Sequence, residues 1–146
     1  MRVFHLVAAA ALLAAEAPAA AEKWYRVGGD DNVAAYVDAD SIRTEGGIRY
    51  GRVYTVYAEP LDGFLHAAAI LQLFDCAGNY FQTIEYSFYG EGNAHLATEA
   101  SATRDERRTP DPESFNEFFF RFVCQGTGGV EVADAWSDAQ GRLRKR

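Results

Sequence analysis

The sequence contains only two cysteines, Cys76 and Cys124, in a chain whose N-terminus has the pattern of an export signal. In an exported protein, two cysteines most simply form one disulfide bridge. Neither belongs to a CxxC pair or a histidine cluster, which are the usual patterns of thiol chemistry and metal binding. On the chain-entropy account, a bridge over this span stabilises the fold by roughly 4 kcal/mol. We therefore expect a structural disulfide between Cys76 and Cys124.

Residues 1–21 follow the order of a secretory signal peptide. A basic start at Arg2 precedes an apolar run over residues 3–15, and small residues follow at positions 17–21. The apolar run has thirteen residues, whereas a membrane-spanning helix needs about 20. We expect cleavage after Ala21, with Ala19 as a second candidate. Because no cysteine stands near this region to carry a lipid, we expect a non-lipidated protein that is periplasmic or secreted and not inserted in the membrane.

The charge and composition narrow the class of partner. The formal net charge is −7 at neutral pH, so the chain repels phosphate backbones and we expect no nucleic-acid partner.

Aromatic residues make up 14% of the chain, which favours a packed core over disorder. Removing 21 of 146 residues leaves 125, a length that suits one domain.

Short apolar runs rich in Val, Ile, Tyr and Phe alternate with Gly, Asp and Asn clusters, which predicts a strand-rich domain. The run over residues 65–75 is apolar on both faces and predicts a strand covered on both sides. Residues 38–43 offer Asp38 or Ser41 as the cap of a single helical turn. We expect strands over residues 24–27, 33–37, 48–59, 65–75 and 80–89, a weak one over 94–98 and a short one over 130–133.

One amphipathic helix follows the strands. Its predicted cap is Asp111, with Pro112 at the first helical position, and glycines from Gly126 onward end it. An apolar stripe with the spacing of one helix face is formed by Phe115, Phe118, Phe119, Phe122 and Val123. The sequence thus predicts an α+β fold, in which an antiparallel sheet is linked by the disulfide to this C-terminal helix. We expect the domain over residues 22–126 and a partly flexible tail over 127–146.

The sequence contains no catalytic signature. It has no Gly-x-Ser-x-Gly elbow, no HExxH and no phosphate-cradling loop, and the mature part holds only His66 and His95. Asp30, Asp31 and Asn32 lack the spacing of a calcium loop. We expect no catalytic residues, no metal and no cofactor. An enzyme without a recognisable motif stays open as an alternative.

The predicted strand over residues 48–59 is rich in tyrosine and arginine, the residue types enriched at interface hot spots. The alternative is an ordinary half-buried sheet face, because tyrosine is also a good strand former. We take Arg52 and Tyr54 as the candidate binding residues, beside Arg49, Tyr50 and Tyr57.

Several of these segments together resemble the surface-adhesin protein E family of bacterial envelope proteins. The matching residues are 24–27 (Trp-Tyr-Arg-Val), 35–42, the Phe-Asp-Cys ending at Cys76 and the Phe-Val-Cys ending at Cys124. The resemblance implies an antiparallel sheet of about six strands with the C-terminal helix disulfide-bonded to it. It also implies non-catalytic adhesion to host matrix or serum proteins, sometimes as a homodimer. No binding residue of the family is identified in this sequence. An inhibitor or accessory factor of envelope enzymes stays open as a second alternative.

Overall fold

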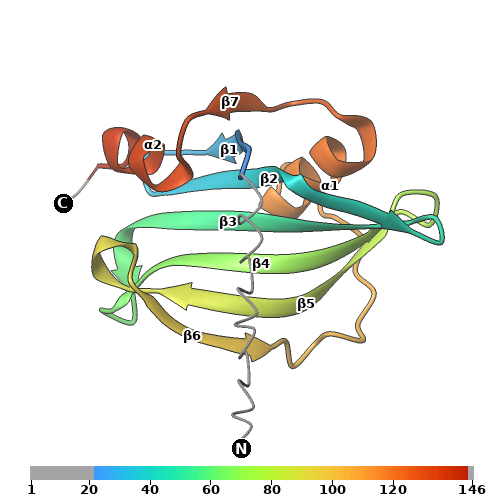
Figure 1. Cartoon of the computed structure of the whole chain (residues 1–146), viewed down its shortest axis with the longest axis horizontal. Helices are drawn as coiled ribbons and strands as arrows, with labels where there is room; N and C mark the ends of the chain where they lie inside the picture. The colour runs from blue at the N-terminus through green and yellow to red at the C-terminus, as the bar shows by residue number, and fades with distance from the viewer. Residues whose placement is uncertain (1–21, 145–146) are drawn as a thin grey trace, which may run out of the picture.

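The computed structural model describes residues 22–144, which form one antiparallel sheet with two helices (Figure 1). The sheet has seven strands in the order β6-β5-β4-β3-β2-β1-β7. The α+β prediction is therefore confirmed, and the sheet has seven strands where the family resemblance implied about six. The strands are β1 (Trp24–Gly29), β2 (Val33–Glu45), β3 (Ile48–Leu61), β4 (Leu65–Asp75), β5 (Tyr80–Tyr89), β6 (His95–Ala100) and β7 (Val130–Val132). The predicted signal peptide and its cleavage site lie outside the described residues.

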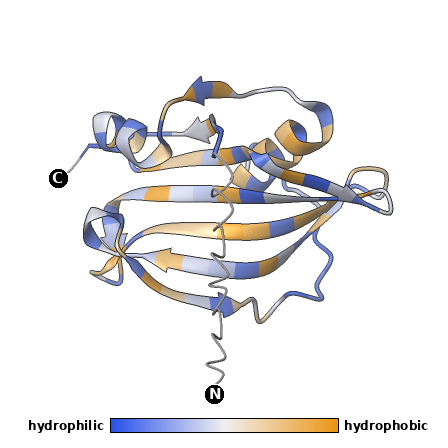
Figure 2. Ribbon diagram, viewed as in Figure 1, coloured by the Kyte–Doolittle hydropathy of each residue, from blue (hydrophilic) through white to orange (hydrophobic). Residues whose placement is uncertain are grey.

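The two faces of the sheet carry separate cores, because side chains alternate along each strand. On one face, α1 (Phe115–Gln125) packs Phe119 and Val123 against Val53 and Phe74; we call this the α1 face. On the other, α2 (Ala135–Arg142) covers a second cluster; we call this the α2 face. Figure 2 shows the resulting mixture of apolar and polar colour along the strands. The α2-face cluster contains Trp24, Tyr36, Tyr54, Val56, Ala67, Ala135, Ala139 and Leu143.

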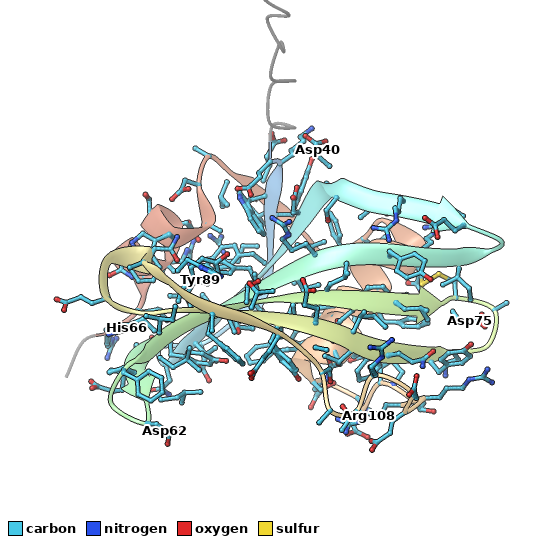
Figure 3. The ribbon with its side chains drawn as sticks, turned by 60° about the horizontal axis from the view of Figure 1, so that its bottom comes forward. Asp40, Asp62, His66, Asp75, Tyr89 and Arg108 are labelled. Carbon is cyan, nitrogen blue, oxygen red and sulfur yellow. A yellow bond between two sulfur atoms is a disulfide. The ribbon has the colours of Figure 1, made fainter. Side chains whose placement is uncertain are left out.

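The disulfide between Cys76 and Cys124 is confirmed. Its S–S distance is 2.08 Å, and the two Cα atoms lie 5.5 Å apart. Cys76 directly follows β4, and Cys124 lies in the last turn of α1. Figure 3 shows the bridge beside Asp75. The bond therefore ties α1 to an interior strand of the sheet.

The helix α1 begins later than the sequence predicted. Its N-cap is Ser114, whose hydroxyl oxygen accepts a hydrogen bond from the Glu117 amide at 3.2 Å. The Glu117 carboxylate in turn accepts from the amide of Glu113, the residue before the cap, at 2.6 Å. Asp111 is not the cap, because the Ser114 hydroxyl donates to its carbonyl oxygen within a preceding turn. Gly126 ends the helix, as predicted, and it has a left-handed conformation.

The helical turn predicted over residues 38–43 is wrong: these residues continue β2. The pairing of β2 with β3 shifts register between Asp38 and Arg43. The Asp38 carboxylate, only 4% exposed, accepts hydrogen bonds from the Lys23 and Asp40 amides, each at 3.1 Å. The Ser41 hydroxyl oxygen accepts from the Arg52 amide at 2.7 Å. The polar side chains that suggested a helix cap instead satisfy the backbone of an irregular strand.

The residues after Gly126 contain the helix α2, which the sequence did not predict. Asp134 caps it by accepting a hydrogen bond from the Ser137 amide at 2.7 Å. Ala135, Ala139 and Leu143 are buried against the sheet. The strand expected over residues 130–133 is present as β7, which pairs with β1. Within residues 22–144, no helix is both long and apolar enough to cross a membrane.

Candidate binding groove

The two predicted binding residues, Arg52 and Tyr54, lie on the α2 face of β3 with different exposure. The Arg52 side chain is 51% exposed, and its Nη1 lies 3.4 Å from Oε1 of Glu22. Tyr54 is only 5% exposed. The structure therefore leaves Arg52 accessible to a partner, whereas Tyr54 belongs mostly to the core.

Tyr54 stands among other aromatic rings. Its ring centroid lies 5.5 Å from that of Trp24 and 6.1 Å from that of Tyr89, in an edge-on arrangement with Tyr89. Its hydroxyl donates a 2.7 Å hydrogen bond to Oδ1 of Asn93. Burial raises the pKa of Tyr54 above its ordinary value, helped by the neighbouring Tyr89. The phenol is therefore a structural hydrogen-bond donor that stays neutral at physiological pH.

A small pocket of about 90 Å³ opens beside these rings. The sheet supplies one wall, and the start of α2 supplies another through Asp134, Ala135 and Trp136. Glu22 stands at the rim, where its carboxylate accepts a 3.1 Å hydrogen bond from the Trp24 indole. We call this the aromatic pocket; its principal lining residues are Trp24, Arg52, Tyr54, Tyr89, Asn93 and Trp136.

A larger hollow of about 310 Å³ adjoins the aromatic pocket, and the two share Arg52 and Ala69. Its floor is the small side chain of Ala69 together with Leu71 on β4. We call it the arginine groove; besides Ala69, its lining residues are Ser41, Arg43, Arg52, Ile70, Leu71, Glu85 and Ser87.

The sheet register sets the positions of the groove walls. Arg52, Leu71 and Glu85 stand directly opposite one another on β3, β4 and β5. Adjacent strands lie about 4.8 Å apart, so the backbones that carry Arg52 and Glu85 are separated by roughly 10 Å. The groove therefore presents a guanidinium on one wall and a carboxylate on the other.

The other residues of the predicted tyrosine and arginine patch do not gather at the groove. Arg49 points to the α1 face, where its guanidinium donates to the carbonyl oxygens of Val123 and Cys124. Arg49 thereby satisfies carbonyls at the end of α1. The Tyr57 hydroxyl oxygen accepts a 3.1 Å hydrogen bond from Thr55. Tyr50 carries the Arg43 guanidinium over its ring, 4.5 Å from the centroid.

The two histidines of the described chain stand in different settings. His66 lines a separate hollow with Pro60 and Gln140, beside the β3–β4 hairpin that carries Asp62 (Figure 3). His95 Nε2 lies 2.8 Å from the Thr98 hydroxyl oxygen, and its ring meets Tyr89 edge-on (labelled in Figure 3). Within residues 22–144, no group of three His, Cys, Asp or Glu side chains is placed to hold a metal ion.

Trp136, Tyr89 and Asn93 line the pocket but were not singled out in the sequence. They lie on three different elements and meet only through the sheet order and the packing of α2. The signal that could have pointed to Trp136 is its rarity, because the chain has only two tryptophans.

Comparison with known proteins agrees with the fold. The crystal structure of Haemophilus influenzae protein E matches with a TM-score of 0.51 and 16% identity, over 72% of this chain and 86% of that one. A second crystal form of the same protein gives a TM-score of 0.51 and 15% identity, over 72% and 89% of the two chains. No curated protein matches the chain. The sequence pattern described as Surface-adhesin protein E matches residues 24–125, from the start of β1 to the end of α1. The chain therefore belongs to the surface-adhesin protein E family.

Proposed function

We propose that this chain is an exported, non-catalytic adhesin-type module that binds a host macromolecule through its α2 face. The observation that carries the proposal is membership of the surface-adhesin family, which supports an adhesin-type role. The disulfide supports export, because such bonds persist in oxidising compartments outside the cytoplasm. Neither an inhibitory nor an enzymatic role gains support from these findings.

The α2 face is the better candidate surface because α1 occupies the β1 to β4 part of the other face. On the α1 face, the helix is held by the disulfide and packs three buried residues against the sheet. On the α2 face, the helix covers only one part, and the arginine groove beside it stays open. Arg52 stands where this groove meets the aromatic pocket and is accessible. Arginine and aromatic side chains around a hollow are the usual composition of an interface hot spot.

The test is the binding of the purified mature protein, residues 22–146, to immobilised basement-membrane extract. We expect saturable binding that weakens on Arg52→Gln. The matched control is Arg121→Gln on α1, whose side chain is 42% exposed and lies outside the groove. Absence of saturable binding by the wild-type protein would refute the adhesin proposal. Equal loss in both variants would instead place the binding surface elsewhere.

Two parts of the proposal concern the state of the protein in its native host. Cleavage after Ala21 predicts a mature chain that begins at Glu22, which N-terminal sequencing of periplasmic and medium fractions would detect. A homodimer stays a prediction, and light scattering of the purified protein measures it. A product that retains residues 1–21 in the cytoplasm would contradict export.

A further inference from the structure

The aromatic pocket is built partly by residues that lie beyond the family match. That match ends at residue 125, whereas Asp134, Ala135 and Trp136 come from the C-terminal segment that follows. The same segment buries Ala135, Ala139 and Leu143 against the family sheet. The strands β1 to β6 lie within the family match, whereas this wall of the pocket lies outside it. The C-terminal segment of this chain therefore adds a pocket wall to the sheet of the family.

This wall is held in place by polar contacts at its base. The Asp138 carboxylate accepts hydrogen bonds from Arg26 Nη1 and from the Tyr36 hydroxyl, each at 2.8 Å. Both partners are on strands of the sheet. Because the helix is anchored at Asp138, Trp136 is presented at the pocket without a large ordering cost on binding.

The floor of the groove excludes one common mode of recognition. Ala69 and Leu71 lie on β4, an interior strand that is paired with β3 and β5 at these positions. Their backbone groups are used within the sheet, so a peptide cannot bind here by adding a strand. Any ligand of the groove must be recognised by side chains.

Those side chains have the chemistry that an acidic sugar requires. Half-buried Trp136 and Tyr89 offer aromatic surface for an apolar sugar face. Arg52 and exposed Arg43 offer guanidinium groups for a carboxylate. Glu85 and Ser87, on the opposite wall, offer hydrogen-bonding groups for hydroxyls.

We propose that the aromatic pocket and the arginine groove together bind an oligosaccharide that contains a carboxylate-bearing sugar. The sugar carboxylate pairs with Arg52 and displaces Glu22, whose contact with Arg52 is long at 3.4 Å and exposed on both sides. Neighbouring hydroxyls face Glu85 and Ser87 across the groove. This inference rests on the proposed adhesin function, since such sugars would be presented on host surface and matrix molecules.

The chain carries its own reporter for this test. It has two tryptophans, Trp24 and Trp136, and both line the aromatic pocket. Tryptophan fluorescence of the purified mature protein therefore reports directly on occupancy. The probes are 3′-sialyllactose and a hyaluronan tetrasaccharide, which carry the carboxylate on two different sugars. Lactose is the neutral control, and an acidic hexapeptide is the non-sugar control.

We expect a saturable fluorescence change at millimolar concentrations with at least one acidic sugar, and little change with lactose or the peptide. Which acidic sugar binds distinguishes a sialylated from a uronate-containing source. Loss of the charge-assisted contact in Arg52→Gln should weaken the binding at least about tenfold. Arg121→Gln should bind like the wild type. Arg52 is exposed, so its substitution leaves the core intact, and a circular dichroism spectrum verifies this.

Three results would overturn the inference: no saturation with either acidic sugar, equal binding of lactose, or an unchanged affinity in Arg52→Gln. Binding of the acidic peptide in place of the sugars would overturn it too. The outcome is separable from that of the adhesin proposal. If the protein binds matrix but no acidic sugar, only the sugar site is refuted. If it binds an acidic sugar but no matrix, only the adhesin role is refuted.

Discussion

The hydroxyl of Tyr36 donates a 2.8 Å hydrogen bond to Oδ2 of Asp138, which ties the fully buried middle of β2 to α2. Arg26 Nη1 binds both oxygens of the same carboxylate at 2.8 Å, and Arg142 Nε lies 3.3 Å from Oδ1. One half-buried carboxylate thus joins two strands to the C-terminal helix.

Replacing this carboxylate should loosen α2. We expect Asp138→Asn to lower the free energy of unfolding by about 1–3 kcal/mol, because Arg26 and Tyr36 lose a charged acceptor. Urea denaturation measures the change. The control is Asp31→Asn, which removes an exposed ion pair with Arg144 and should cost less than about 1 kcal/mol. Equal effects of the two substitutions would refute a special role for Asp138.

The stability should also fall in acid through Asp138. Burial acts to raise the pKa of Asp138, but the hydrogen bonds from Arg26 and Tyr36 outweigh it and hold the pKa below its ordinary value. A lowered folded-state pKa means stabilisation that is present above the unfolded pKa of about 3.9 and lost as pH falls through the folded value. Denaturation curves between neutral pH and strong acid should show this loss. The acid-induced loss should be smaller in Asp138→Asn than in the wild type.

We expect substitutions of Tyr54 to lower the free energy of unfolding, because the ring belongs mostly to the core. Tyr54→Ala removes a ring packed between Trp24 and Tyr89 and should cost about 3–5 kcal/mol. Tyr54→Phe removes only the hydrogen bond to Asn93 and should cost about 1 kcal/mol. Thermal denaturation measures both. A negligible effect of the alanine substitution would contradict the core position of Tyr54. Binding experiments on this residue should therefore use the phenylalanine variant.

Two glycines in the sheet should respond differently to alanine. A Cβ at Gly28 would lie 2.5 Å from a ring carbon of Phe118 on α1, so that ring must move. A Cβ at Gly51 would meet its nearest neighbours at 3.6 Å, an ordinary contact distance. We expect Gly28→Ala to cost about 1–3 kcal/mol through overpacking. Gly51→Ala should be neutral or slightly stabilising, and comparison of the two melting temperatures checks the packing of α1 on β1.

Reduction of the disulfide should destabilise the domain by about 4 kcal/mol, because the bridge closes a loop of 48 residues. Urea denaturation with and without a reductant measures the loss, and the oxidised protein should be lighter by the mass of two hydrogens. Cys76→Ser with Cys124→Ser should reproduce the effect of the reductant. A stable, fully folded double variant would show that packing of α1 alone suffices.

The elements that the sequence predicted well are those whose signal is local. The phenylalanine stripe of α1 and the strand β5 (Tyr80–Tyr89) each repeat at the period of their own structure. The helix α2 has only a weak apolar stripe, and it depends on contacts with Arg26 and Tyr36, more than 100 residues away in the chain. Because these contacts are distant in the sequence, the local residue pattern could not predict α2.

In the candidate site, too, the residues with a local signal were predicted and those placed by distant contacts were not. Arg52 was predicted from the composition of a single strand, and it lies at the junction of the groove and the pocket. Trp136 was not predicted, because its place depends on how α2 folds back over the sheet. The prediction for Tyr54 named a residue of the pocket wall, but strand composition did not show how deeply the ring is buried.

The bridge between Cys76 and Cys124 also determines how the molecule can behave under mechanical load. If one end is held by a bound surface and the other is pulled by flow, the 48-residue span inside the bridge cannot be drawn out. At about 3.3–3.6 Å per extended residue, this withholds roughly 160 Å of contour length. The locked loop contains all of β5, β6 and most of α1. A tether made from this chain would therefore extend only through the segments outside the loop, which hold β1 to β4, β7 and α2.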